Sequence, residues 1–290
     1  MKNKLDKIAK DTNLFLRRFI NRQKKSELIT AMKYGLFSGG KKIRSKILVD
    51  IGLIFNVNYK DLIRVGSAVE CIHAYSLIHD DLPCMDNDLI RRGKASTHVK
   101  FGESTAVLAG NSLLTMAFEI LSHNDFNISK KIKVNLINKI SEVSGHLGIA
   151  GGQFLDLNFE HKKVSKKKVV EMEVKKTGKL FSFCCVAPLI LKTRNKKDLN
   201  EFENIGEDIG LLFQVADDLI DHKGTMIDAG KKTGKDKKKG KATLISLLGY
   251  KNTIKYADYL ILKINNKIKR YGLKSKNLSE TLDYILNRNK

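Results

Sequence analysis

Proline, the residue that most strongly interrupts a helix, occurs only twice among the 290 residues of this chain, at Pro83 and Pro188. Proline lacks a backbone N–H and its ring clashes with the preceding turn, so a chain that avoids it can form long helices. Apolar residues recur at helical spacing along most of the sequence, as in LIRVGSAVECIHAYSLIHD at residues 62–80. The sequence therefore predicts an all-α fold.

Several segments have apolar side chains three and four residues apart, and we predict helices at residues 62–80, 130–150, 166–192 and 201–221. Polar or glycine-containing breaks join such runs at residues 36–42, 81–97 and 223–240. Neither an internal repeat nor a linker rich in Pro, Gly or Ser divides the chain. We therefore expect one domain, residues 1–290, built as a single bundle of many helices.

The formal net charge is +23, and it comes mostly from lysines spread along the chain. It has two open explanations, a composition biased toward Lys, Asn and Ile, or attraction of polyanionic substrates. No basic stretch is interleaved with aromatic residues, so nucleic acid is not expected as a partner. The four cysteines lack metal or redox spacing, no apolar leader begins the chain, and no apolar run of about 18 residues is apparent. We expect a cytoplasmic protein without a membrane span.

The first cluster of carboxylates reads DDLPCMDND at residues 80–88 and follows an apolar helical run. Pro83 should end the helix that carries Asp80, because proline cannot continue a helix and restrains the residue before it. Asp86 must then return toward Asp80 through the loop. The sequence therefore predicts that these two carboxylates lie near each other.

The second cluster reads FQVADDLID at residues 213–221, with Asp217 and Asp221 one helical turn apart on the same face. Neighbouring carboxylates repel unless cations neutralise them, and magnesium binds carboxylates together with water and phosphate oxygens. Aspartate pairs at helix ends also serve as caps or solvated charges. Two such clusters on apolar helices favour metal binding. Gly206 and Gly210 precede the second cluster, and either a ligand or a closely packed helix could use the space they leave.

Basic residues accompany the two clusters. SGGKKIR at residues 38–44 is a glycine turn that opens a helix, and its Lys41 and Arg44 stand one turn apart. His73 shares a helix face with Asp80. Each of these residues alone could be solvated, but two acidic clusters with several basic sites suit two diphosphates, one bound through metal and one bound directly. The other basic candidates are Arg91, Arg92, Lys176, Lys231 and Lys241.

These segments closely resemble the trans-isoprenyl diphosphate synthase family, especially bacterial farnesyl diphosphate synthases, with geranylgeranyl diphosphate synthases second. DDLPCMD followed by RRG resembles the first aspartate-rich motif of the family, and FQVADDLID resembles the second. GGKKIR, HAYSLIHDD, GGQFLDL and KTGKL also match, so the resemblance extends from about Gly39 to Gly249. Three positions depart from the family pattern: Leu89, Ala95 and the ATLI that follows Lys241.

The resemblance implies a helical bundle around a large central cavity, a homodimer, and condensation of isopentenyl diphosphate with an allylic diphosphate. It implies three magnesium ions bound by Asp80, Asp86 and Asp217. The catalytic residues that it implies are Asp80, Asp81, Asp86, Lys176, Thr177, Gln214, Asp217, Asp218 and Asp221. Substrate contacts carried over for isopentenyl diphosphate are Lys41, Arg44, His73, Arg92 and Phe213, and those for the allylic diphosphate are Arg91, Lys176, Lys231 and Lys241.

Product length is assigned, by the same resemblance, to the residues four and five positions before Asp80, which are Ser76 and Tyr75. A tyrosine ring there should stop elongation at fifteen carbons and give farnesyl diphosphate. The alternatives are a geranylgeranyl diphosphate synthase or a noncatalytic subunit of a heteromeric synthase. A class I terpene cyclase usually carries a different second metal motif, and a squalene-type synthase carries DxxxD motifs, so both fit the sequence less well.

Overall fold

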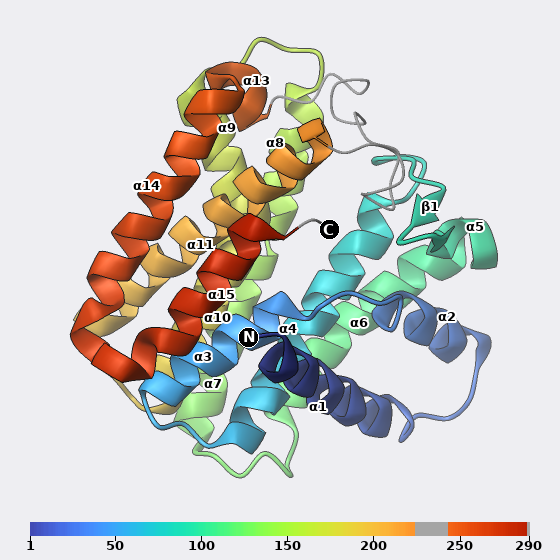
Figure 1. Cartoon of the computed structure of the whole chain (residues 1–290). Coiled ribbons are helices and arrows are strands. Elements are labelled where there is room, and N and C mark those ends of the chain that lie inside the picture. The colour runs from blue at the N-terminus through green and yellow to red at the C-terminus, as the bar shows by residue number, and fades with distance from the viewer. Residues whose placement is uncertain (224–242, 289–290) are drawn as a thin grey trace. The chain divides into compact units, whose positions relative to one another are not determined.

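The computed structural model describes residues 1–223 and 243–288 (Figure 1). The chain divides into two compact units, residues 2–138 and, together with Met1, the residues from 139 onward. Helices dominate both units, and the strands among the described residues are β1 (Ile90–Arg91) and β2 (Lys94–Ala95). The predicted all-α fold is therefore confirmed, with one small hairpin that the sequence did not predict.

The unit of residues 2–138 is organised around a central helix, α4 (Tyr59–Asp80), which packs against four other helices. Leu62, Ala68 and Cys71 of α4 are fully buried and lie on different sides of this helix, and Figure 1 shows α6 (Glu103–Ser122) beside it. A helix surrounded by protein is apolar all round instead of having one apolar stripe. The remaining helices are α1 (Lys2–Ile20), α2 (Glu27–Leu36), α3 (Ile43–Ile54), α5 (Thr97–Phe101), α6 (Glu103–Ser122) and α7 (Lys130–Ser144), the last of which continues past residue 138.

The hairpin of β1 and β2 lies in the segment that follows the first aspartate cluster. Its strands are antiparallel and pair Ile90 with Ala95. The two turn residues, Arg92 and Gly93, have φ angles of 53° and 75°. Two consecutive positive φ angles match the twist of a two-residue hairpin, so this turn fixes the direction of the Arg92 side chain.

The second unit is organised around α11 (Lys196–Lys223). This helix packs against α10 (Lys179–Leu191), η1 (Val174–Gly178), α14 (Tyr250–Ile268) and α15 (Lys276–Asn287). A Cβ atom on Gly206 would lie 2.3 Å from the Cα of Ser182, and one on Gly210 would lie 2.4 Å from the Cα of Gly178. Of the two explanations for these glycines, close helix packing is therefore the correct one. The other elements are α8 (Ile149–Phe159), α9 (Lys166–Glu173), η1 (Val174–Gly178), α10 (Lys179–Leu191), α13 (Leu244–Leu248), α14 (Tyr250–Ile268), η2 (Lys269–Ser275) and α15 (Lys276–Asn287).

Two predicted helices differ in detail from the structure. The helix predicted over residues 130–150 is interrupted, because α7 ends at Ser144 and α8 begins at Ile149. Gly148 precedes α8 with φ −130° and ψ −127°, outside the helical region. The segment 166–192 is helical as predicted, but the residues of η1 form a π-helix between α9 and α10.

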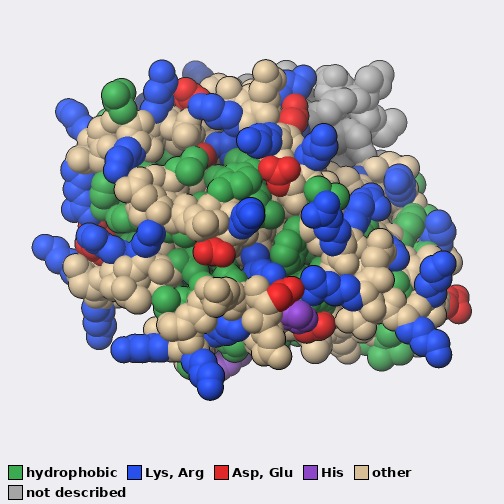
Figure 2. All heavy atoms as spheres, turned by 90° about the horizontal axis from the view of Figure 1, so that it is seen from below, with side chains coloured by type: hydrophobic (Ala, Val, Ile, Leu, Met, Phe, Trp, Pro, Cys, Tyr) green, Lys and Arg blue, Asp and Glu red, His purple; other side chains and the backbone are tan. Residues whose placement is uncertain are grey.

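One helix of the described residues, α6, is long and apolar enough to cross a membrane by length and composition, although the sequence indicated none. A core helix passes the same test, and 44% of the apolar window of α6 is buried inside the protein. On the face shown in Figure 2, Lys and Arg side chains are scattered among neutral ones and do not form one patch. This distribution agrees with a net charge that is spread along the chain.

Candidate active site

The first aspartate cluster begins where α4 ends. Helix α4 stops at Asp80, and the following loop turns back so that the backbone N–H of Asp86 donates to the carbonyl oxygen of Asp80 at 2.9 Å. The N–H of Asp88 likewise donates to the carbonyl oxygen of Asp81 at 3.2 Å. The predicted helix end near Pro83 and the predicted return of Asp86 are both confirmed. Asp80 and Asp86 are half-buried, so they keep access to solvent.

Asp81 differs from Asp80 and Asp86 because its carboxylate is buried against Arg91. The guanidinium donates to Asp81 from Nε at 2.9 Å and also from Nη2, and Nη2 lies 3.5 Å from Asp88. Burial raises the pKa of Asp81, and the hydrogen bonds from Arg91 oppose that rise. In this structure Arg91 therefore braces the loop of the first cluster from within.

Arg92 extends in another direction, toward the glycine turn that precedes α3. Its Nη1 donates to the carbonyl oxygen of Gly39 and lies 3.4 Å from the hydroxyl of Ser38. Gly40 has a φ of 100°, which other residues rarely adopt, and a Cβ atom there would lie 2.7 Å from Arg92 Nη1, so this position favours glycine. The structure thus brings Arg92 to the turn that carries Lys41.

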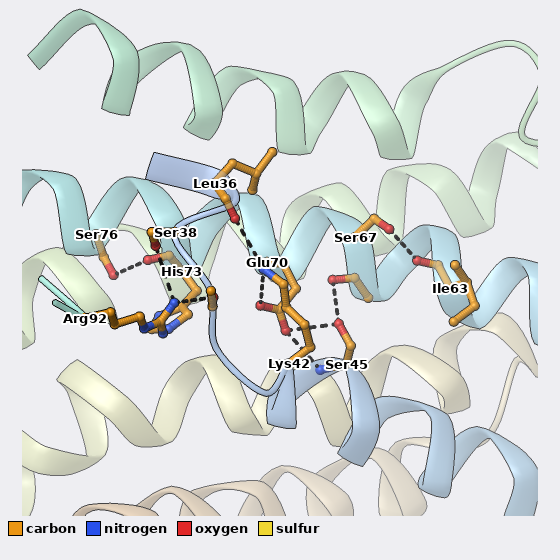
Figure 3. A network of polar contacts seen from close by, with 12 residues as sticks. Leu36, Ser38, Lys42, Ser45, Ile63, Ser67, Glu70, His73, Ser76 and Arg92 are labelled. Carbon is orange, nitrogen blue, oxygen red and sulfur yellow. Dashed lines mark hydrogen bonds and ion pairs between the residues drawn. The ribbon is translucent and has the colours of Figure 1, made fainter. Parts of the chain in front are cut away.

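His73 lies about two turns before the end of α4, and Figure 3 shows its ring beside Arg92. Desolvation by the surrounding protein lowers the pKa of His73 well below its usual value, and the cations Arg44, Arg92, Lys42 and Arg91 lower it further. A neutral imidazole can bind an anion through a hydrogen bond, while the surrounding cations supply the charge. The unit therefore gathers a neutral donor and several cations around one turn.

A buried ion pair that the sequence analysis did not identify supports this turn. Glu70 on α4 is 2% exposed and lies 3.5 Å from the ammonium group of Lys42. Its carboxylate also accepts hydrogen bonds from the backbone N–H and the hydroxyl of Ser45, at 3.3 and 3.0 Å (Figure 3). The signal in the sequence is a single acidic residue within an otherwise apolar stretch of α4.

In the other unit, α11 carries the second aspartate cluster, with Asp217 and Asp221 half-buried and one turn apart. Asp218 is buried, and it accepts a hydrogen bond from the side-chain amide of Gln214 at 3.0 Å. The hydroxyl of Thr177 donates to the amide oxygen of Gln214 at 3.4 Å. The predicted residues Thr177, Gln214 and Asp218 are therefore joined in one hydrogen-bonded chain.

Lys176 lies in the π-helical segment η1, where its ammonium group pairs with Asp156 of α8 at 2.5 Å. Single turns of π-helix occur often at functional sites. Gln153, one turn before Asp156, is 7% exposed, and its side-chain amide has no hydrogen-bond partner among the described residues. A buried amide without a partner is costly, which favours a ligand near it. Both residues belong to the GGQFLDL segment, which the sequence analysis matched without assigning them a role.

Asp217 also has a partner that the sequence analysis missed. Arg288 follows the last helix, and its Nη2 lies 2.7 Å from Asp217 Oδ1. The guanidinium lies 3.8 Å from the centroid of the Phe213 ring and is almost fully buried. Asp217 itself keeps 47% of its side chain exposed. Nothing in the lysine-rich C-terminal sequence distinguishes this arginine from a solvated one.

Each unit has carboxylates of the kind that magnesium binds. Asp80 and Asp86 offer accessible oxygens in one unit, and Asp217, which pairs with Arg288, offers one in the other. Within the described part of the chain, no three His, Cys, Asp or Glu side chains are grouped so that they could hold a metal ion by themselves. Magnesium usually takes one or two carboxylates and completes its coordination with water and phosphate oxygens. Lys231 and Lys241 lie outside the described residues.

Comparisons with known proteins place these features in a family. The family model described as "Polyprenyl synthetase" matches residues 25–285. The farnesyl diphosphate synthase of Escherichia coli (strain K12) is 38% identical over 99% of this chain and 98% of its own length. The geranylgeranyl diphosphate synthase of Cyanophora paradoxa is 34% identical over 97% of this chain and 93% of its own length.

A solved structure shares the fold as well. The geranyltransferase from Helicobacter pylori, complexed with magnesium and isoprenyl diphosphate, superposes with a TM-score of 0.82 at 32% identity. The match covers 98% of this chain and 96% of that one. The ordered aspartate motifs, the helical fold and these full-length similarities agree with one another, and the chain belongs to the polyprenyl synthetase family.

Proposed function

We propose that this prenyltransferase condenses isopentenyl diphosphate with dimethylallyl or geranyl diphosphate and gives (2E,6E)-farnesyl diphosphate. One observation carries the proposal: two aspartate-rich motifs occur in order in a chain that matches farnesyl diphosphate synthases over nearly its whole length. The chain would act as one polyprenyl synthase domain in the cytoplasm.

The residues divide between the two substrates. Lys41, Arg44, His73 and Arg92 would bind isopentenyl diphosphate directly, with Phe213 as an apolar wall. The mutual proximity of the glycine turn, Arg92 and His73 supports this assignment. The allylic diphosphate would be bound through magnesium at Asp80, Asp86 and Asp217, with direct contacts from Arg91, Lys176, Lys231 and Lys241.

The reaction produces an allylic cation and a diphosphate anion, and the side chains of this protein would stabilise both charges. Magnesium, when bound, would offset the charge of the diphosphate and so make it a better leaving group. The allylic C–O bond breaks, the isopentenyl double bond forms the new C–C bond, and a proton is lost, with the released diphosphate as its acceptor. The chain of Thr177, Gln214 and Asp218 holds an amide oxygen that can steady the allylic cation. Apolar walls must exclude water, which would otherwise trap that cation.

A product assay tests the function. The protein is incubated with isopentenyl diphosphate, one allylic starter and magnesium, and the dephosphorylated products are separated by chromatography. We expect a fifteen-carbon alcohol that is absent when magnesium is chelated. A twenty-carbon product would instead support the geranylgeranyl alternative, which the Cyanophora relative keeps open. Failure to consume isopentenyl diphosphate with any starter would contradict a catalytic function and support the noncatalytic subunit.

We also propose that the protein is a homodimer that packs through α6. Val107 and Leu108 on this helix are 37% and 54% exposed, and no charged residue stands between Glu103 and Glu119. A helix that lacks charged residues over this length and exposes apolar side chains is unusual in a chain with 29% charged residues. A second copy of the chain would cover this face.

Leu108→Lys should therefore convert a dimer into a monomer, because it places a charge at the covered face. Light scattering coupled to size exclusion measures the change in mass. Leu273→Lys is the matched control, since Leu273 is 91% exposed on η2 and should tolerate the charge. A wild-type protein that is monomeric at micromolar concentration would contradict this proposal, as would a dimeric Leu108→Lys variant.

A further inference from the structure

The turn between α2 and α3 is held from two sides by side chains of other segments. At the glycine residues of this turn, Arg92 donates a hydrogen bond to the carbonyl oxygen of Gly39. On the helix side, Lys42 donates to the carbonyl oxygen of Leu36 at 3.4 Å and pairs with Glu70. Figure 3 shows Glu70 reaching from α4 to the start of α3. The turn is therefore fastened at the residues that flank Lys41.

The backbone at the start of α3 explains why this fastening is needed. Lys42 is the N-cap residue, and it has a left-handed φ of 53° with no side-chain capping hydrogen bond. A non-glycine residue in this region is strained, and such strain persists only where surrounding contacts hold it. The first N–H groups of a helix also lack partners within the helix. The left-handed backbone of Lys42 and the first N–H groups of α3 therefore both need a contact from outside this helix.

Glu70 meets both needs with one buried carboxylate. Its Oε1 accepts the backbone N–H of Ser45, the third residue of α3, which is the hydrogen bond that a capping side chain usually provides. Its Oε2 faces the ammonium group of the strained Lys42. The negative charge also suits the positive end of the helix dipole. Glu70 thus holds the side chain of Lys42 and the backbone N–H of Ser45, on either side of Ile43 and Arg44.

We propose that Glu70 is a positioning residue for isopentenyl diphosphate, acting through Lys42 and Ser45 on the turn that carries Lys41 and Arg44. This inference rests on the proposed function of that turn. Glu70 makes no contact with substrate in this proposal. Its charge would repel a diphosphate, so a purely electrostatic role and a positioning role predict opposite effects when the charge is removed.

The test is Glu70→Gln, which keeps the shape and removes the charge. If Glu70 positions the turn, the KM for isopentenyl diphosphate should rise by about tenfold or more, while kcat and the KM of the allylic substrate change by less than about threefold. Calorimetric titration with isopentenyl diphosphate alone should show the same loss of affinity. Unchanged or tighter binding would overturn the proposal.

Two further variants separate an effect on stability from an effect on substrate binding. Asp50→Asn breaks the other buried ion pair of α3, in which Asp50 and Lys46 are 2% and 1% exposed, and it should lower Tm without changing the KM for isopentenyl diphosphate. Lys42→Met combined with Glu70→Gln removes both charges of the pair, which should restore Tm but leave the KM high. A parental KM in this double variant would contradict the positioning role.

The experiments distinguish a failure of the proposed function from a failure of the proposed role of Glu70. A parent protein that neither binds nor condenses isopentenyl diphosphate would remove the proposed function itself. A parent that does both, together with a Glu70→Gln variant of parental affinity, would remove only the role of Glu70.

Discussion

Asp80→Asn and Asp217→Asn should each lower kcat by at least about a hundredfold, because each removes a charged oxygen ligand from the proposed magnesium sites. Asparagine preserves the size of the side chain and a carbonyl oxygen, so the packing of α4 and α11 should change little. Turnover is measured at increasing magnesium concentration. We expect the activity that remains to require more magnesium than the parent does, since the affinity for the metal falls.

The control for charge removal is Asp258→Asn on the exposed face of α14, which should keep parental turnover. Circular dichroism and Tm separate a folding defect from a catalytic one. Asp217→Asn also weakens the ion pair between Asp217 and the almost buried Arg288. We therefore expect a modest fall in Tm for this variant and not for Asp80→Asn. Near-parental turnover in either active-site variant would contradict the proposed role of both clusters in metal binding.

The helices that carry the two clusters could be predicted from the sequence, because local signals and the fold agree there. In α4 an apolar run ends at Asp80, shortly before Pro83, and in α11 the apolar side chains keep one helical register over many residues. The return of Asp86 toward Asp80 follows from the same proline. These features depend on residues close together in the chain.

The features that could not be predicted have no distinctive local sequence pattern. The break before α8 depends on the backbone at Gly148, and glycine is also tolerated within helices, so its presence does not mark an end. The π-helical geometry of η1 has no sequence pattern that distinguishes it from α-helix. Sequence spacing also left open whether Gly206 adjoins a ligand or a helix, and only the packing of Ser182 against it decides.

The supporting contacts of the candidate site were the least predictable. Glu70 and Ser45 are 25 residues apart, and Arg288 and Asp217 are 71 residues apart. Motif reading identifies the residues that could contact substrate, because their types and spacing recur. The groups that hold those residues are chosen by tertiary packing, and a buried glutamate or a terminal arginine carries no local pattern.

Tyr75→Ala should shift the product from fifteen carbons to twenty carbons or more. Tyr75 precedes Asp80 by five residues on α4, which corresponds to a rise of about 7.5 Å along the helix. Its side chain is 8% exposed, and its ring packs edge-on against His79 with centroids 5.5 Å apart. We predict that this buried ring stops a growing chain whose diphosphate is bound at Asp80.

The pKa of Tyr75 agrees with a buried phenol. Burial raises the pKa of Tyr75 to about 12, and the negative charge of Asp80 adds to the rise. The phenol therefore remains neutral at any pH used for assay, so its proposed role is steric. Ser76, the other position assigned to chain length, donates its hydroxyl to the carbonyl oxygen of His73 at 3.0 Å and has little bulk to offer. We therefore expect a much smaller change in product length for Ser76→Ala than for Tyr75→Ala.

Chromatography of the dephosphorylated products measures the ratio of fifteen-carbon to longer chains. This ratio does not depend on the fraction of folded enzyme, which is useful because Tyr75→Ala removes a buried ring and should destabilise the protein. Tyr75→Met retains more apolar volume and should give the same shift with a smaller fall in Tm. Tyr259→Ala is the matched control, since this tyrosine is 56% exposed on α14. If Tyr75 only packs in the core, parent and both Tyr75 variants will make one product mixture, and the farnesyl assignment will lose its main structural support.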